Sequence, residues 1–128
     1  MASSEPIAEI VVPAKRRVLV CGGRDYSDAE YMALVLKAAD PGVIIHGAAK
    51  GADTLAGKWA HDHGVPVEEF PADWEKHGLQ AGPLRNLQML TEGKPDLVIA
   101  FPGGKGTAHM RKVARAHDVQ VVTVKFDL

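Results

Sequence analysis

A glycine-rich turn that carries a lysine and a threonine is the stretch of this 128-residue sequence best suited to chemistry. It comprises residues 102–107 (PGGKGT), after the apolar run Leu97–Ala100 and before a segment with helical spacing. Glycines let the backbone turn sharply and approach another group closely. At the start of a helix, such a turn presents unpaired N–H groups that attract a phosphate. We therefore predict an anion site here, and the alternative is a tight turn without a ligand.

The composition is that of a single domain with a real core: 46% of the residues are hydrophobic, 24% are charged and the net charge is -1. A balanced charge argues against a general binder of polyanions but allows a local cluster for a small phosphorylated ligand. The lone cysteine, Cys21, excludes an intramolecular disulfide and is expected to be a small buried side chain. We expect a cytoplasmic protein with no membrane segment, no metal and no evident cofactor.

The elements that must position this turn are short apolar strands that alternate with segments of helical spacing. The strands are expected at residues 17–21, 43–46, 65–70, 97–101 and 119–124. This alternation predicts an α/β, Rossmann-like single domain, with an about five-stranded, mainly parallel sheet and helices on both faces. The domain is expected at residues 15–128, after an N-terminal tail or edge segment at residues 1–14. The turns that follow the strands should converge at the carboxyl edge of the sheet, where ligands bind.

Local signals predict how the helices begin and which sides they bury. Ser27 and Glu30 have the spacing of a capping box, and Asp53 is a plausible N-cap of the next helix. Residues 71–82 are expected to be a polar loop. The helix after that loop is predicted to bury three leucines: Leu84, Leu87 and Leu90.

Four permanent cations are expected around the converging turns, with His46 and His109 close by: Arg24, Lys50, Arg85 and Lys105. Arg85 is placed near the start of a helix, where the helix dipole disfavours a cation. It is therefore expected to hold a ligand anion, and a salt bridge to Asp73 or Glu75 is the alternative. Trp74 is expected either to stack on a base or to cover the core.

The predicted ligand-binding residues come from all four turns. They are Gly22, Gly23, Arg24, Asp25, His46, Gly47, Lys50, Gly51, Asp53, Asp73, Trp74, Arg85, Asn86, Pro102, Gly103, Gly104, Lys105, Gly106 and Thr107. The aspartates among them are expected to bind a ribose or a base, or else to cap a helix or a turn. Thr107 is expected to cap the following helix or to bind the same anion as the glycines.

Four motifs in series carry a family likeness: residues 22–25 (GGRD), 46–53 (HGAAKGAD), 82–86 (GPLRN) and 102–107. Together they resemble the SLOG superfamily and, within it, the YspA/YpsA-related branch, over about Arg17 to Val124. The resemblance implies a Rossmann-like domain that binds nucleotides or nucleotide-derived ligands. The superfamily includes the LOG enzymes, which release a free base from a nucleoside monophosphate, and the DNA-processing protein A family, which binds single-stranded DNA.

The LOG motif, Pro-Gly-Gly-x-Gly-Thr-x-x-Glu, is matched here except at its glutamate, which is Met110. Methionine cannot supply the negative charge that glycosidic cleavage uses. If the protein is an enzyme, the catalytic candidates are Arg85, which stands for the LOG arginine, with Asp73 or Asp25, and Glu75 is a further carboxylate.

The resemblance thus implies binding or sensing of a nucleotide-like phosphorylated ligand more directly than catalysis. A LOG-like hydrolase that cleaves an N-glycosidic bond is the alternative. A single-stranded nucleic-acid binder is the second alternative, which the net charge makes the weaker one. A homodimer or a higher homo-oligomer is expected, as in related families.

Overall fold

The computed structural model describes residues 15–125, which form one five-stranded parallel sheet in the order β3-β2-β1-β4-β5. The predicted α/β, Rossmann-like class is therefore confirmed, while the possible edge strand around Ile10–Val12 lies outside the described residues. The strands are β1 (Arg17–Cys21), β2 (Val43–His46), β3 (Val67–Glu69), β4 (Leu97–Ala100) and β5 (Gln120–Thr123).

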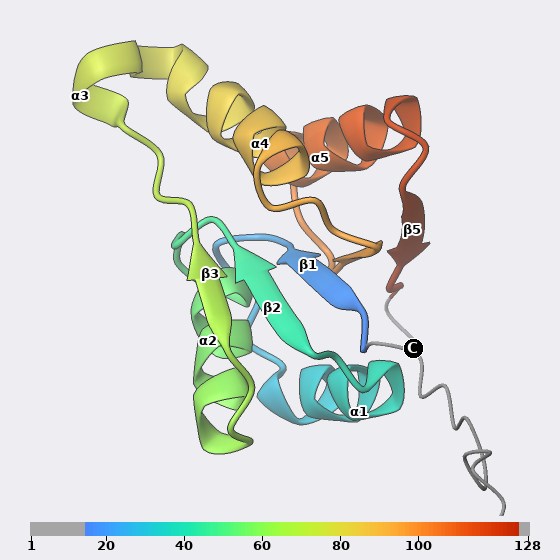
Figure 1. Ribbon diagram of the computed structural model, residues 1–128. Helices are drawn as coiled ribbons and strands as arrows, with labels where there is room; N and C mark the ends of the chain where they lie inside the picture. The colour runs from blue at the N-terminus through green and yellow to red at the C-terminus, as the bar shows by residue number, and fades with distance from the viewer. Residues whose placement is uncertain (1–14, 126–128) are drawn as a thin grey trace, which may run out of the picture.

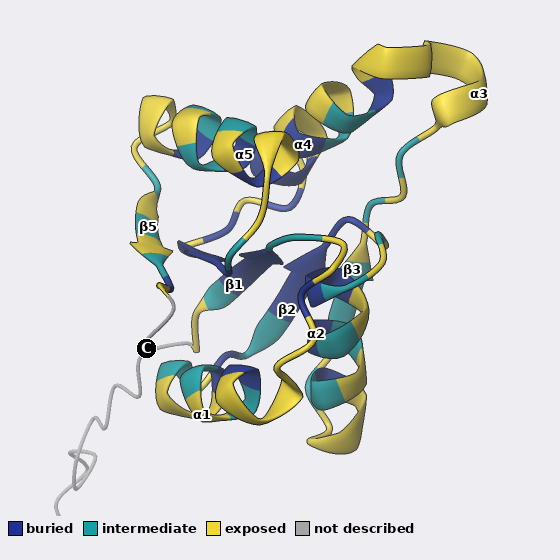
Figure 2. Cartoon of the chain, turned by 180° about the vertical axis from the view of Figure 1, so that it is seen from behind, coloured by how far each residue is buried: buried dark blue, intermediate teal, exposed yellow. Residues whose placement is uncertain are grey.

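Helices cover both faces of the sheet, with α1 and α2 on one face and α4 and α5 on the other (Figure 1). Both views place α3 at the outer end of α4, away from the sheet (Figures 1 and 2). No helix within residues 15–125 combines the length and the apolar character that crossing a bilayer requires. The helices are α1 (Ala29–Ala39), α2 (Ala52–Asp62), α3 (Trp74–His77), the 3₁₀ helix η1 (Gly78–Gln80), α4 (Ala81–Thr91) and α5 (Lys105–Ala116).

The central strands are buried on both sides, which explains why they read as unbroken apolar runs. Along β1, Val18 and Val20 pack with α1 and α2, whereas Leu19 and Cys21 pack with α4 and α5. Figure 2 shows the carboxyl-terminal parts of β1 and β2 in dark blue between the two helical layers. Successive side chains of a strand point to opposite faces. A position in a strand therefore decides which helical layer its side chain meets.

The predicted capping box at Ser27 is wrong, because α1 begins one residue later. Asp28 is the N-cap, and its carboxylate accepts a hydrogen bond of 3.0 Å from the backbone N–H of Tyr31. Aspartate caps a helix as well as serine does. With Asp28 in this place, Glu30 is only the second residue of the helix and cannot close a box.

The prediction that Asp53 caps α2 is also wrong. The N-cap is Gly51, with φ of 78° and no side-chain cap. Only glycine adopts this left-handed backbone without strain, and a Cβ atom here would overlap the carbonyl oxygen of Gly23. Asp53 lies in the first turn of α2, where its carboxylate is free for other partners.

Residues 71–82, predicted as a polar loop, contain α3, η1 and the start of α4. Asp73 caps α3 by accepting from the N–H of Lys76 at 3.1 Å, so the alternative of a capping role for this aspartate is confirmed. The leucine side predicted for α4 is wrong at two of its three positions, because Leu84 and Leu87 are exposed. The buried side of α4 instead carries Ala81, Asn86, Met89 and Leu90.

Three of the β–α turns meet at the peptide groups of Gly23. Its N–H donates to the carbonyl of Pro102 at 2.8 Å, and its carbonyl accepts from the N–H of Ala52 at 3.1 Å. A Cβ atom at Gly103 would lie 2.6 Å from the nitrogen of Gly23. The turns after β1, β2 and β4 are thus packed backbone against backbone, which holds the carboxyl edge of the sheet together.

This junction makes Gly51 intolerant of a side chain. We expect Gly64→Ala, also at positive φ (67°) but with no atom within 4 Å of the new methyl group, to lower the free energy of unfolding by about 1–2 kcal/mol. Gly51→Ala adds overpacking against Gly23 and should cost about 1–3 kcal/mol more. Urea unfolding of both variants measures the difference, and equal losses would contradict the tight junction.

Candidate functional site

A cleft of about 680 Å³ opens at the carboxyl edge of the sheet, between the turns after β1 and β4 and the amino half of α4. Its size is that of a small-molecule site. It lies at the switch point of the sheet, because β1 leads to α1 on one face while the neighbouring β4 leads to α5 on the other.

The structure brings part of the predicted set together in this cleft. The predicted residues that line it are Gly22, Gly23, Arg24, Asp53, Trp74, Arg85, Asn86, Gly104, Lys105, Gly106 and Thr107. The predicted residues outside its lining are Asp25, His46, Gly47, Lys50, Gly51, Asp73, Pro102 and Gly103. His109, expected nearby, lines it as well. Residues outside the predicted binding set also line it: Cys21, Leu79 and Met89, and Ala49, Gly82 and Pro83 from within the motifs.

The amino end of α5 faces the cleft without a cap. Its N-cap is Gly104, and Thr107, one of the predicted caps, makes no capping hydrogen bond. Within residues 15–125, no hydrogen bond uses the backbone N–H groups of Lys105, Gly106 and Thr107. A Cβ atom at Gly104 or Gly106 would meet no atom within 4 Å, so open space lies beside both glycines, and residues 104–107 line the cleft.

A hydrogen-bond chain crosses the cleft from the turn after β2 to α5. Arg85 donates from Nη1 to the carbonyl of Gly47 and from Nε to Oδ1 of Asn86 at 3.2 Å. Asn86 in turn lies 3.3 Å from the carbonyl of Gly106 and 3.1 Å from Nδ1 of His109, both through Nδ2. Asn86 is buried, and its amide group is satisfied by these partners. A helix pattern that is based on leucines does not reveal such a buried polar residue.

This chain fixes the orientation of the Asn86 amide. Arginine Nε can only donate, so Oδ1 of Asn86 faces Arg85 and Nδ2 faces His109. The amide of Asn86 is thereby oriented between the guanidinium of Arg85 and the imidazole of His109.

Asp53 is the carboxylate of the cleft, since no other aspartate or glutamate among residues 15–125 lines it. Its Oδ2 accepts hydrogen bonds from the N–H groups of Gly47 at 3.0 Å and Ala49 at 3.2 Å. Burial raises the pKa of this carboxyl, while the hydrogen bond from Ala49 and the charges of His46 and Arg85 oppose the rise. These two N–H groups of the turn after β2 are therefore already hydrogen-bonded to Asp53 and are not available to a ligand.

The cations of the cleft are not ion-paired within residues 15–125. Within the described part of the chain, Arg24, Arg85 and Lys105 form no salt bridge, so the alternative of an ion pair between Arg85 and Asp73 or Glu75 is not realised. Burial lowers the pKa of the Arg85 guanidinium, the charge of Asp53 opposes that shift, and the charge of Arg24 adds to it. Lys50 is exposed and is not part of the cleft lining.

The other predicted catalytic candidates do not reach the cleft. Asp25 is exposed in the turn after β1, and Asp73 caps α3. Met110, at the position of the LOG glutamate, is fully buried in the core beneath α5. Arg85 is the one candidate that lines the cleft.

Cys21 closes the floor of the cleft at the end of β1. It is buried, as predicted, and burial raises the pKa of its thiol to about 12. The thiol therefore stays protonated near neutral pH. Across residues 15–125, no group of three or more histidine, cysteine, aspartate or glutamate side chains could hold a metal ion.

Comparison with known proteins agrees with this architecture. Residues 16–77 match the model of the family described as "YspA, cpYpsA-related SLOG family". The chain is 38% identical over 119 residues to the Gene 61 protein of Mycobacterium phage D29, across 84% of this chain and 94% of the phage protein. This chain belongs to the YspA, cpYpsA-related SLOG family. Membership of that family points to binding or processing of a nucleotide-related ligand.

His46 faces away from the cleft because it follows Ile44 by two positions in β2 and shares its side of the sheet. Its Nδ1 accepts from the N–H of Ala48 at 2.9 Å, and Nε2 lies 3.7 Å from Oε1 of Glu69. A Cβ atom at Gly57, on α2, would lie 2.9 Å from Nε2. Burial lowers the pKa of His46, against the opposing charges of Asp53 and Glu69.

This lowered pKa predicts a pH dependence of stability. Below the ordinary value of 6.5 the unfolded chain protonates His46 and the folded chain does not, so stability is lost as pH falls through that window. The loss is about 1.4 kcal/mol for each unit of pKa difference. In His46→Asn the amide oxygen can still accept from Ala48, so we expect a smaller loss between pH 7.5 and 5.5 in urea unfolding.

The control for this experiment is His117→Gln, at an exposed histidine just after α5, which should keep the full loss. An unchanged pH dependence in His46→Asn would contradict the role assigned to this buried imidazole.

Proposed function

We propose that this domain binds a nucleotide or a nucleotide-derived phosphorylated ligand in the cleft, with a phosphate at the amino end of α5. The observation that carries the proposal is the uncapped start of α5, where three cleft-lining residues have N–H groups without partners in residues 15–125 and the cations of the same cleft form no salt bridge. Helix dipole and N–H groups together favour an anion at such an end. Membership of the SLOG family supports the ligand class.

The charges around the cleft support the same conclusion. Arg24 and Arg85 lie near enough for the charge of Arg24 to lower the pKa of Arg85, and no protein anion in residues 15–125 pairs with either one. A phosphate between them removes this repulsion and accepts charge-assisted hydrogen bonds. Because the net charge of the chain is -1, the attraction for anions comes from this local cluster and not from the whole surface. This favours a small phosphorylated ligand over a nucleic-acid strand.

The open space at Gly104 gives a direct test. We expect AMP or another nucleoside monophosphate at 100 times its Kd to raise the Tm by several degrees, since binding then adds about 2.7 kcal/mol to stability. In Gly104→Val the isopropyl group enters the space assigned to the phosphate, so the shift should vanish. The free variant should still fold, because no atom lies within 4 Å of the new Cβ.

The matched control is Ala108→Val, which places the same side chain on an exposed position of α5 outside the cleft. Its thermal shift should equal that of the wild type. A full shift in Gly104→Val would discard this helix end as the phosphate site.

Hydrolysis of an N-glycosidic bond is the second candidate, and Asp53 is the observation that favours it. This carboxylate lines the cleft with Arg85 nearby, and two backbone N–H groups hold its Oδ2. Glycosidic cleavage uses a negative charge. Met110, at the position of the LOG glutamate, cannot supply that charge, whereas Asp53 can. A carboxylate held in this way is able to stabilise positive charge on a sugar.

Incubation with nucleoside monophosphates and NAD, followed by chromatography, tests this candidate. The wild type should release free base, and Asp53→Asn should slow the release about 100-fold or more, because the amide oxygen keeps the hydrogen bonds from Gly47 and Ala49 but not the charge. Binding without any base release would remove hydrolysis and leave the binding function in place.

A further inference from the structure

Arg24 and Trp74 make a cation–π contact in the lining of the cleft. The guanidinium carbon of Arg24 lies 5.8 Å from the centroid of the indole ring of Trp74, and both side chains line the cleft. Arg24 comes from the turn after β1 and Trp74 from α3, and two strands, β2 and β3, lie between them along the chain. Two side chains from distant parts of the chain are thus brought together in one cleft.

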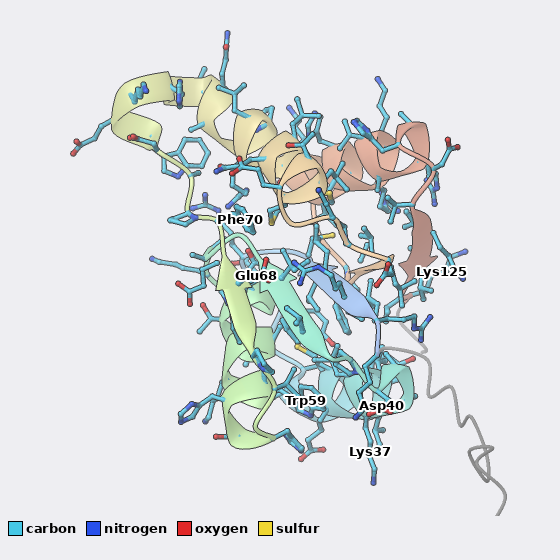
Figure 3. All side chains as sticks on the ribbon, in the orientation of Figure 1. Lys37, Asp40, Trp59, Glu68, Phe70 and Lys125 are labelled. Atoms are coloured by element: carbon cyan, nitrogen blue, oxygen red, sulfur yellow. The ribbon has the colours of Figure 1, made fainter. Side chains whose placement is uncertain are left out.

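Trp74 has no packing role that explains its position. It is 47% exposed, belongs to neither core cluster and sits on a short helix with no buried residue. The chain turns away toward this helix after Phe70, at the end of β3 (Figure 3). The other tryptophan, Trp59, packs against the core from α2 and stacks on His63, with ring centroids 4.3 Å apart (Figure 3). The alternative that Trp74 covers the core is therefore wrong.

The surroundings of Trp74 suit a flat, apolar ligand group. A Cβ atom at Gly82 would lie 3.4 Å from the indole, so the ring lies close to the backbone of α4. Leu79 in η1 and Pro83 in α4 come from the same part of the chain and also line the cleft. These neighbours offer an apolar surface rather than side-chain donors and acceptors.

We infer that Arg24 and Trp74 form a clamp for the nucleobase of the ligand, an inference that rests on the proposed function. Arginine and tryptophan both stack on the π-face of any base. A base held between them needs about 7 Å, twice the roughly 3.5 Å between carbon atoms in contact. In this structure the guanidinium lies over the ring in cation–π contact, so a base enters between them once the exposed Arg24 side chain rotates off the ring.

The clamp assigns the two ends of the ligand. The phosphate lies at α5, and the base lies at Trp74, so the ribose spans the cleft between them. Stacking recognises the face of a base and not its edge. The site therefore takes adenine and guanine nucleotides with similar affinity, and it discriminates against phosphorylated sugars that lack a base.

Calorimetric titration of the wild type with AMP, GMP and ribose 5-phosphate tests the clamp. We expect AMP and GMP to bind with Kd values within about 10-fold of each other, and ribose 5-phosphate to bind about 10-fold or more weakly. Trp74→Leu should weaken AMP binding by a similar factor and leave ribose 5-phosphate unaffected, whereas Trp74→Phe should retain most of the affinity for AMP. The control Lys76→Ala, on the same helix but outside the cleft lining, should bind AMP as the wild type does.

Fluorescence adds a readout specific to the ring. In a Trp59→Phe background Trp74 is the sole tryptophan, and its emission should change with AMP but not with ribose 5-phosphate. Equal binding of AMP and ribose 5-phosphate, or an equal weakening of both by Trp74→Leu, would overturn the clamp and leave the proposed function standing. Failure of all three compounds to bind would overturn the proposed function and the clamp with it.

Discussion

The peptide groups of Gly23 hold together the part of the molecule on which the cleft depends. The N–H bonds the turn after β4 through Pro102, and the carbonyl bonds the start of α2 through Ala52. Glycines at Gly51 and Gly103 allow the chains to approach this closely. Because the contact is backbone to backbone, it leaves side chains of the surrounding turns and of α4 free to line the space beside it.

The cleft beside this junction has two chemically different ends. At one end the start of α5 presents N–H groups without partners in residues 15–125, and at the other the indole of Trp74 lies beside apolar residues of η1 and α4. Arg85 and Asn86 cross between the turn after β2 and α5 by a chain of hydrogen bonds. Arg85 is half-buried near a second cation, Arg24, and neither forms a salt bridge within residues 15–125. This imbalance supports a site for an anion rather than a structural role.

Much of the fold was readable from local signals. Strands buried on both faces read as apolar runs, and glycines marked the turns, so the five-stranded parallel sheet was predicted correctly. The capping residues were not, because Ser27, Asp28 and Asp53 are all good caps by residue type and only the backbone path selects among them. For α4, three leucines outweighed Asn86, whose burial depends on partners in α5.

The sequence by itself determined the order of the elements, the positions of the glycine turns and the edge at which those turns gather. These properties depend on residues near each other in the chain. Only the tertiary structure decided which side chains line the cleft. His46 lies on the face of the sheet opposite the cleft because of its position along β2. Asn86 is buried because of the side that α4 turns toward the core. The position of α3 at the end of α4 brings the indole of Trp74 into contact with Arg24. Each of these outcomes depends on how elements pack across the sheet, which no local pattern encodes.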